Sequence, residues 1–151
     1  PIENFKLSYS FRVREEDEWL NWIDGNELAV YDLTQKIISF NMNWFEGRKH
    51  EVRLKSQFVA LDAENPISLI SNSDGYLFNH TSDVKPFTQG ITSFQIRYKY
   101  EIAPLSYIYA VYTKGGRVYD DENERNTSKV FKDPWNNPDN EIFSLKFRLK
   151  F

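Results

Sequence analysis

Hydrophobic and polar residues alternate along several segments of the chain, a pattern typical of β-strands that have one apolar face. In residues 143–151, Phe or Leu occupies every odd position and Ser, Lys or Arg every even one. Alternation is weaker in residues 38–44 and 52–60, and residues 107–112 are apolar on both parities, so their facing stays open. The pattern predicts six strands, at residues 5–14, 38–44, 52–60, 94–100, 107–112 and 143–151.

The connections between these strands differ in length. Residues 46–50 and 102–105 are short, whereas residues 15–35, 62–90 and 115–140 are long and polar. Long and short connections alternate, which in an antiparallel meander places all short turns at one end. Outer-membrane barrels have short periplasmic turns and long external loops. We therefore predict an all-β fold: an antiparallel up-and-down transmembrane β-barrel segment of about six strands from a larger barrel, with residues 1–151 as the C-terminal segment of one barrel domain.

Three features favour a membrane sheet over a soluble one. Segments of roughly ten residues match a tilted strand that crosses a bilayer. Aromatic residues gather near the short turns, where an interfacial girdle would lie; they are Trp44, Tyr98, Tyr100, Phe147 and Phe151. The mean hydropathy of -0.62 fits a chain whose apolar surface is one parity of each strand. The alternative is a soluble all-β module that binds a carbohydrate or a protein.

The closing strand ends in a C-terminal Phe, and Phe147, Leu149 and Phe151 resemble the signal read by the outer-membrane barrel assembly machinery. Together with residues 51–59, 95–106 and 109–116, this strand resembles the C-terminal end of a family of bacterial outer-membrane proteins. Members carry an N-terminal domain similar to family-nine carbohydrate-binding modules, followed by a large barrel of uncharacterised function. The resemblance covers most of these residues but only the last part of such a protein. It implies the outer membrane of Gram-negative bacteria and brings no established catalytic residues.

Six strands are too few for a closed barrel, because bacterial barrels have at least about eight. An open sheet edge in hydrocarbon leaves backbone groups unpaired, at several kcal/mol for each group. We therefore expect the strands at Phe5 and Phe151 to pair with remaining strands of the barrel, from the same polypeptide or another chain. Lipid and lipopolysaccharide are the expected surroundings.

Basic residues occupy the parity opposite the apolar one, and the predicted strands hold almost no acid there. They are Lys6, Arg12, Arg14, Arg53, Lys55, Arg97, Lys99, Lys146, Arg148 and Lys150. A column of one charge sign favours anions in an open lumen, so we expect a role in channel or transport function, or as a scaffold in an envelope complex. Alternatively, carboxylates from other strands or a plug neutralise these residues and the pore is closed. The formal net charge of -3 gives no general electrostatic case for nucleic acid.

The chain offers little catalytic or metal-binding chemistry. It has no cysteine, which excludes a disulfide framework and a thiolate metal cluster. The predicted topology places His50 and His80 on opposite sides of the membrane, so a shared site is not expected. The acidic residues 120–124 lack the spacing of an EF-hand loop. We predict no catalytic residue, no cofactor and no metal site, and do not expect an enzyme.

The sequence leaves open the role of two aromatic groups in the predicted loops. Residues 19–23 hold Trp19, Leu20, Trp22 and Ile23, which plug the mouth, insert at the outer interface or contact a partner. Trp135, within a run of Asx and proline turns at residues 133–140, either stacks on a sugar or packs on its own loop.

Overall fold

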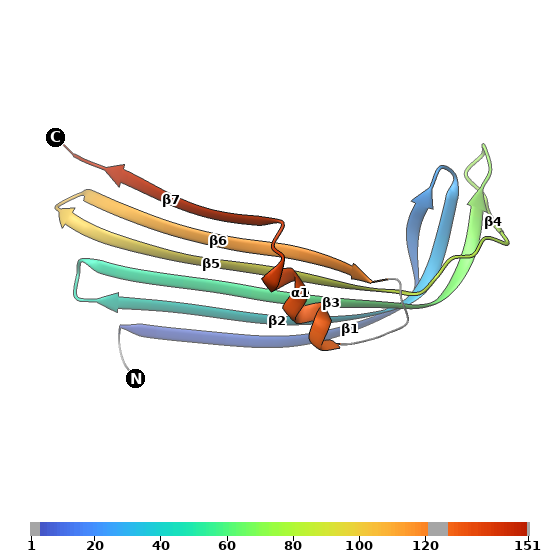
Figure 1. Cartoon of the computed structure of the whole chain (residues 1–151), viewed down its shortest axis with the longest axis horizontal. Helices are drawn as coiled ribbons and strands as arrows, with labels where there is room; N and C mark the ends of the chain where they lie inside the picture. The colour runs from blue at the N-terminus through green and yellow to red at the C-terminus, as the bar shows by residue number, and fades with distance from the viewer. Residues whose placement is uncertain (1–3, 121–126, 151) are drawn as a thin grey trace.

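The described residues form one antiparallel up-and-down sheet of seven strands that does not close on itself (Figure 1). This is a computed structural model, and it describes residues 4–120 and 127–150. The strand order is β1-β2-β3-β5-β6-β7, and the short strand β4 pairs only with β3. The elements are β1 (Phe5–Asp24), β2 (Glu27–Glu46), β3 (His50–Ser71), β4 (Leu77–Asn79), β5 (Phe87–Ala103), β6 (Ser106–Asp120), α1 (Thr127–Asn136) and β7 (Asn140–Arg148).

Each predicted strand segment lies within an observed strand, except that the last one ends early. β7 stops at Arg148, so Leu149 and Lys150 follow the strand, and Phe151 lies outside the described residues. The pairing register brings the apolar parity of every strand to one face. One row across the sheet runs through Leu7, Met42, Leu54, Ile96, Tyr112 and Phe143. We call this side the apolar face and the opposite side the basic face.

The three long loops predicted from the sequence are largely wrong. Residues 15–35 form a β-hairpin, because β1 and β2 continue to a tight turn in which Gly25 has a φ of 52°. β3 extends through Ser71, and β6 continues to Asp120 before α1 begins at Thr127. Charged residues interrupt the alternation here, but neighbouring strands still pair with the backbone, since ladder hydrogen bonds do not depend on side-chain polarity. The first connection is therefore a tight turn and departs from the expected alternation, whereas the connections from β3 to β5 and from β6 to β7 are long, as predicted.

The sheet bends where the register shifts. In β1 the shift falls between Glu16 and Trp19, and in β2 between Val30 and Asp32 opposite a bulge in β3. Glu18 and Asn65 have positive φ values of 57° and 49° there, and bulges increase local twist and bending. Beyond the bulges the β1–β2 hairpin and β4 turn away from the long axis, at the right of Figure 1.

A small core lies at this bend, on the same side of the sheet as the basic face. Its buried members are Ala29, Tyr31, Leu33, Ala63 and Phe87. Trp19 packs against them, with its ring centroid 6.1 Å from that of Tyr31 and 6.4 Å from that of Phe87. Trp19 thus packs on the sheet itself, which is none of the three alternatives given for residues 19–23. Trp22 is exposed, and its Nε1 donates to the Gly25 carbonyl at 3.0 Å.

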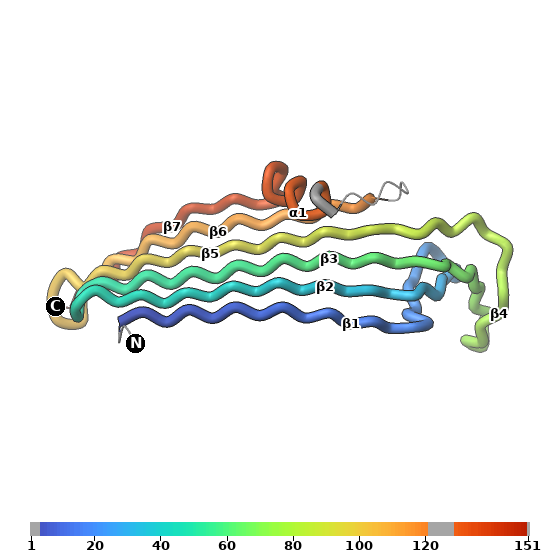
Figure 2. The backbone as a smooth tube through the Cα atoms, turned by 90° about the horizontal axis from the view of Figure 1, so that it is seen from below, coloured from blue at the N-terminus to red at the C-terminus, as the bar shows by residue number. Residues whose placement is uncertain are grey.

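Helix α1 lies on the apolar face, where the sequence predicts only turns. Figure 2 shows it to one side of the layer of strands. Val130 and Pro134 are buried against the sheet, and Phe131 contacts Phe58 with ring centroids 6.1 Å apart. The approach is close because two glycines face the helix: a Cβ built on Gly90 or Gly116 would lie 2.2 Å from the carbonyl oxygen of Val130 or Pro134, respectively. Across the described residues, no helix is long and apolar enough to span a membrane.

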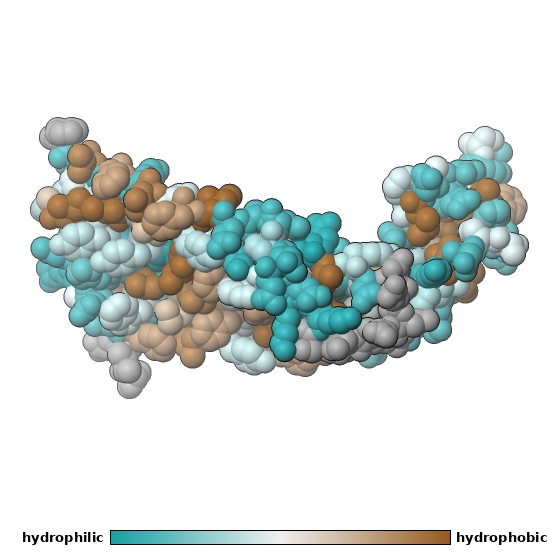
Figure 3. Space-filling view, in the orientation of Figure 1, coloured by the Kyte–Doolittle hydropathy of each residue, from teal (hydrophilic) through white to brown (hydrophobic). Residues whose placement is uncertain are grey.

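Much of the apolar face is uncovered. In Figure 3, brown hydrophobic side chains gather at the end of the sheet that holds the β2–β3 and β5–β6 turns, and the teal region in the centre includes α1. Phe143 and Phe147 on the edge strand β7 are 66% and 62% exposed, and Tyr9 and Phe11 on the other edge strand are 67% and 57% exposed. The helix therefore covers the middle of this face and leaves both edge strands open.

Candidate functional site on the basic face

The basic residues predicted to share a face do so along the strands. Lys6, Arg53 and Arg97 lie in one row of the sheet, through Asn43, and Lys99 and Lys146 lie in the next, through Tyr109. The strand parity places four further residues on the same face: Arg12, Arg14, Lys55 and Arg148. Lys150 lies after the end of β7, where its backbone N–H donates to Ser106 Oγ at 3.1 Å.

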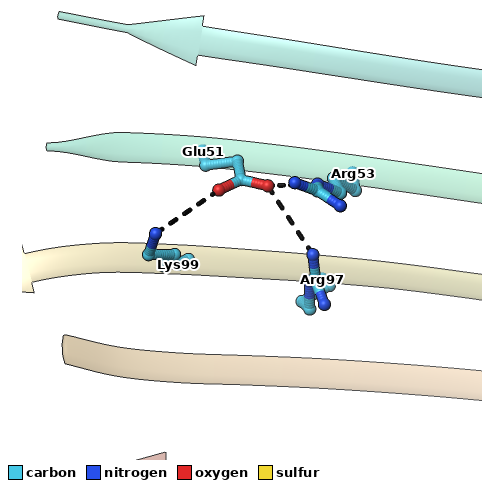
Figure 4. Close-up of polar contacts among 4 residues, drawn as sticks. All are labelled: Glu51, Arg53, Arg97 and Lys99. Atoms are coloured by element: carbon cyan, nitrogen blue, oxygen red, sulfur yellow. Dashed lines mark ion pairs between the residues drawn. The ribbon is translucent and has the colours of Figure 1, made fainter. Parts of the chain in front are cut away.

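A buried carboxylate lies among these cations and was missed from the sequence. Glu51 is only 8% exposed. Its carboxylate forms ion pairs with the guanidinium of Arg53, with Arg97 Nη2 at 3.6 Å and with Lys99 Nζ at 3.6 Å (Figure 4). Glu51 lies one residue before the predicted segment 52–60, so the prediction assigns it to neither face of the sheet. Extending the alternation backwards by one position would have found it.

The Glu51 cluster, which we define as Glu51, Arg53, Arg97 and Lys99, brings three positive charges to one negative charge. Its carboxylate therefore reduces the mutual repulsion of the cations, yet a positive surplus remains. Lys99 Nζ also lies 4.4 Å from the centroid of the Tyr107 ring, which favours a cation. The result is an ordered, positively charged surface near the β2–β3 turn.

The expectation that the basic parity holds almost no acid is wrong for the observed strands. The strands are longer than predicted, and the added residues include Glu16, Glu51 and Glu101 on this face. Glu16 pairs with Arg14 at 2.5 Å just before the bulge in β1, but both side chains are exposed, so this pair contributes little to stability. The basic face is partly neutralised from within the chain.

Uncharged polar side chains occupy the middle of the basic face. Together with Lys55 they line a shallow hollow of about 330 Å³; the uncharged residues are Ser39, Asn41, Gln57, Ser93 and Gln95. Gln57 Nε2 donates to Ser39 Oγ at 3.4 Å. Hydroxyl and amide groups can both donate and accept hydrogen bonds, so this surface suits water and hydrated or polyhydroxylated solutes.

The two histidines do not share a site. His50 Nδ1 lies 2.6 Å from the Tyr98 hydroxyl, and its ring stacks on Tyr100 with centroids 4.8 Å apart. His80 follows β4, and its Nε2 lies 3.6 Å from Glu27. In the part of the chain that the structure describes, no three His, Asp or Glu side chains gather as a metal site would require.

The remaining candidates fall in or near α1. Of the acidic run, Asp120 ends β6, and residues 121–124 lie outside the described residues. Trp135 belongs to α1 and packs on the sheet, with its ring centroid 5.5 Å from Phe94. Lys114 Nζ lies 4.8 Å from the same ring. Trp135 is thus held by the apolar face, although part of the ring stays exposed.

No protein family, curated protein or solved structure matches this chain. The family resemblance of the closing strands stays a prediction. The arguments about function below depend on the geometry of the two faces.

Proposed function

We propose that this sheet is part of the wall of an outer-membrane β-barrel that passes anionic solutes. In this proposal the apolar face lies against acyl chains and the basic face lines a water-filled lumen. The observation that carries it is the contrast between the two faces: large apolar side chains lie exposed on both edge strands of one face, whereas the other face is polar and carries more cations than acids along the strands.

The exposed apolar side chains would be costly in water. Burying a large apolar side chain stabilises a protein by roughly 1.5–3 kcal/mol. A side chain that is about half exposed therefore contributes roughly 1 kcal/mol less than it would if it were fully buried. The odd-numbered residues of β1 and β7 form two such rows: Phe5, Leu7, Tyr9, Phe11, Val13, Phe143, Leu145 and Phe147. Exposed apolar rows of this kind indicate a surface that another apolar medium covers.

The dimensions of the uncovered region suit a bilayer. From His50 at the β2–β3 turn to Phe58 beneath α1, an eight-residue rise spans about 26 Å along the strand, or about 20 Å after a tilt near 40°. The lipid-facing band of a membrane barrel is about 25 Å tall. At the turn end, Trp44, Tyr98, Tyr100 and Phe147 share the apolar face, as the sequence predicts for an interfacial girdle.

The edges of the sheet call for additional strands in this setting. β1 pairs only with β2, and β7 only with β6, so one edge of each has no ladder partner within the described sheet. In hydrocarbon each unpaired backbone group costs several kcal/mol. We propose that strands from the same polypeptide or another chain complete the wall, and that the assembly machinery inserts it through Phe147, Leu149 and Phe151.

The basic face supports anion passage. The Glu51 cluster keeps a positive surplus at one end of the lumen, and the polar hollow around Gln57 and Ser93, which includes Lys55, lies beside it along the strands. A surface of one sign in a low-dielectric wall concentrates ions of the opposite sign. A scaffold role in an envelope complex is the variant of this proposal in which the lumen does not conduct.

A soluble all-β binding module is the second candidate. One observation favours it: α1 covers Phe58 and Phe94 as a helix does in a soluble two-layer domain. The exposed faces of Phe143 and Phe147 argue against it, because no described element covers them.

Neighbouring residues of β7 provide the test. The chain has no cysteine, so Leu145→Cys and Lys146→Cys each introduce a single thiol, on the apolar and basic faces respectively. Each variant is labelled with an environment-sensitive fluorophore and reconstituted in lipid vesicles. We expect nitroxide-labelled lipid to quench the probe at residue 145 and a water-soluble quencher to reach the probe at residue 146.

Quenching of both probes by the aqueous reagent, in a protein that is monodisperse without detergent, would support the soluble module. For the transport role, reversal potentials in a salt gradient should show anion preference. Cation preference would refute anion passage, and an absence of conductance in a bilayer-inserted protein would support the scaffold.

A further inference from the structure

Helix α1 divides the apolar face into two regions of different polarity. On the side toward the β2–β3 turn, a groove is lined mainly by aromatic and aliphatic side chains. On the other side, the hollow of about 230 Å³ beside Val130 is lined by Thr34, Lys36, Asp62, Glu64 and Thr88. Within that hollow Lys36 pairs with Asp62 at 3.6 Å. The change from apolar to charged surface occurs across a single helix.

The groove beside α1 is large enough for part of a lipid. Its volume is about 490 Å³, within the range of ligand pockets. The sheet contributes Phe40, Leu54, Ser56, Phe58 and Phe94, and the helix contributes Phe131, Lys132, Trp135 and Asn136. Leu54 also belongs to the row that contains Leu7, Ile96 and Phe143, so the groove opens onto the exposed apolar surface.

The rim of the groove on the helix side is cationic. Lys132 is exposed at the groove, and Lys114 lies over the Trp135 ring. The nearby acids are Asp133, next in sequence, and Glu141, which pairs across the sheet with Lys114 and accepts a hydrogen bond from the Tyr112 hydroxyl at 2.5 Å. Lys114 thus has an acid opposite it in the ladder and does not line the groove, whereas Lys132 does, so Lys132 is the charge best placed to meet an anionic head group.

We propose that the groove holds one acyl chain of an anionic membrane lipid, with the lipid phosphate at Lys132. This inference rests on the proposed function, since it needs the apolar face to lie in a bilayer. In it, α1 lies at the outer boundary of the lipid band, with its apolar side on the sheet and Lys132 at the head groups. Trp135, amphipathic and partly exposed, occupies the depth at which tryptophan is enriched in membrane proteins.

Tryptophan quenching by brominated lipids tests the proposal. The Trp135 contribution is taken as the difference between the parent protein and Trp135→Phe, each in phosphatidylcholine vesicles that contain brominated phosphatidylglycerol or brominated phosphatidylcholine. We expect brominated phosphatidylglycerol to be enriched at Trp135 roughly five-fold over brominated phosphatidylcholine, as one lysine near an anionic lipid provides. Lys132→Glu should abolish this enrichment. Lys49→Glu, the same charge change in the distant β2–β3 turn, should leave it intact.

Equal quenching of Trp135 by both brominated lipids in the parent, or no quenching at all, would overturn the groove assignment. So would full enrichment in Lys132→Glu. These results would leave the proposed wall function standing if the probe at residue 145 is quenched by nitroxide lipid. If nitroxide lipid does not quench the probe at residue 145, both the groove proposal and the proposed wall function are refuted. Lys132→Gln, which neutralises without reversing charge, should reduce the enrichment and serves if the reversal prevents folding.

Discussion

The docking of α1 depends on the missing side chain of Gly116, and Gly116→Ala should displace the helix. The added Cβ would lie 2.2 Å from the Pro134 carbonyl oxygen, 3.0 Å from its carbonyl carbon and 3.1 Å from its Cα. These are backbone atoms, so no rotamer change relieves the clash. Ordinary contact begins at 3.4 Å, and the helix must therefore move away by about 1.2 Å at this point.

The expected cost follows from the packing that this movement disturbs. Pro134 is fully buried and Val130 is 6% exposed, and both sit between the helix and the sheet. Inserting a methyl group into well-packed surroundings costs about 1–3 kcal/mol. We expect Gly116→Ala to lower the free energy of unfolding by that amount. Trp135 lies in the last turn of the helix and contacts Phe94. Its fluorescence emission should shift as its ring becomes more exposed to solvent.

Gly115→Ala is the matched control. It adds the same methyl group to the adjacent residue on the opposite face, where the nearest atoms are the Thr92 carbonyl oxygen at 3.3 Å and Asn140 Oδ1 at 3.4 Å. Because alanine is favoured over glycine in a strand by about 0.5–1 kcal/mol, the control should be neutral or slightly stabilising. Denaturant titration of both variants, followed by tryptophan fluorescence, measures the difference.

Equal stability of the two variants, with unchanged Trp135 emission, would refute the close packing of α1 on the sheet. Loss of stability in both variants by the same amount would show that the strand β6, and not the helix, is sensitive to added volume.

Two further predictions concern charge. Glu51→Gln should increase anion preference and lower stability by about 1–3 kcal/mol, because it leaves three cations without their shared carboxylate; Glu46→Gln on the exposed end of β2 should change neither the reversal potential nor the unfolding midpoint. Burial, and then the nearby Tyr119, raise the pKa of Tyr31 above 10.0, at the bend and outside the proposed lipid band. The folded state then holds the phenol proton more tightly than the unfolded state does. The contribution of Tyr31 to the free energy of unfolding is therefore fully present below pH 10 and is lost as the pH rises above 10 through the pKa of the folded state. Tyr31→Phe should flatten that alkaline fall in thermal unfolding, whereas Tyr76→Phe, at an exposed residue, should not.

The alternation of apolar and polar residues predicts the position of most strands and the direction of their side chains, but not in every segment. Alternation in residues 5–14, 94–100 and 143–151 predicts both the strands and their apolar side, because side-chain direction in a strand has a period of two and needs no partner. The same rule fails for residues 107–112, where both parities are apolar. Only pairing with β5 and β7 places Ile108, Ala110 and Tyr112 on the apolar face.

The alternation also predicts part of the candidate site on the basic face. The shared face of Arg53, Arg97 and Lys99 follows from parity, but the presence of Glu51 among them depends on where β3 begins. Strand ends are set by turns and by ladder partners, which short-range alternation does not encode.

By itself, then, the sequence determined a two-faced antiparallel sheet, because an alternating chain can hide its apolar side chains only by presenting them on one side of a pleat. The tertiary structure decided what lies on that side. Helix α1 forms from residues that read as turns, since Pro134 and several poor helix formers are compensated by Val130, Phe131 and Trp135 packing on the sheet. Two glycines distant in sequence from the helix make that contact possible, and this complementarity exists only once the strands are aligned.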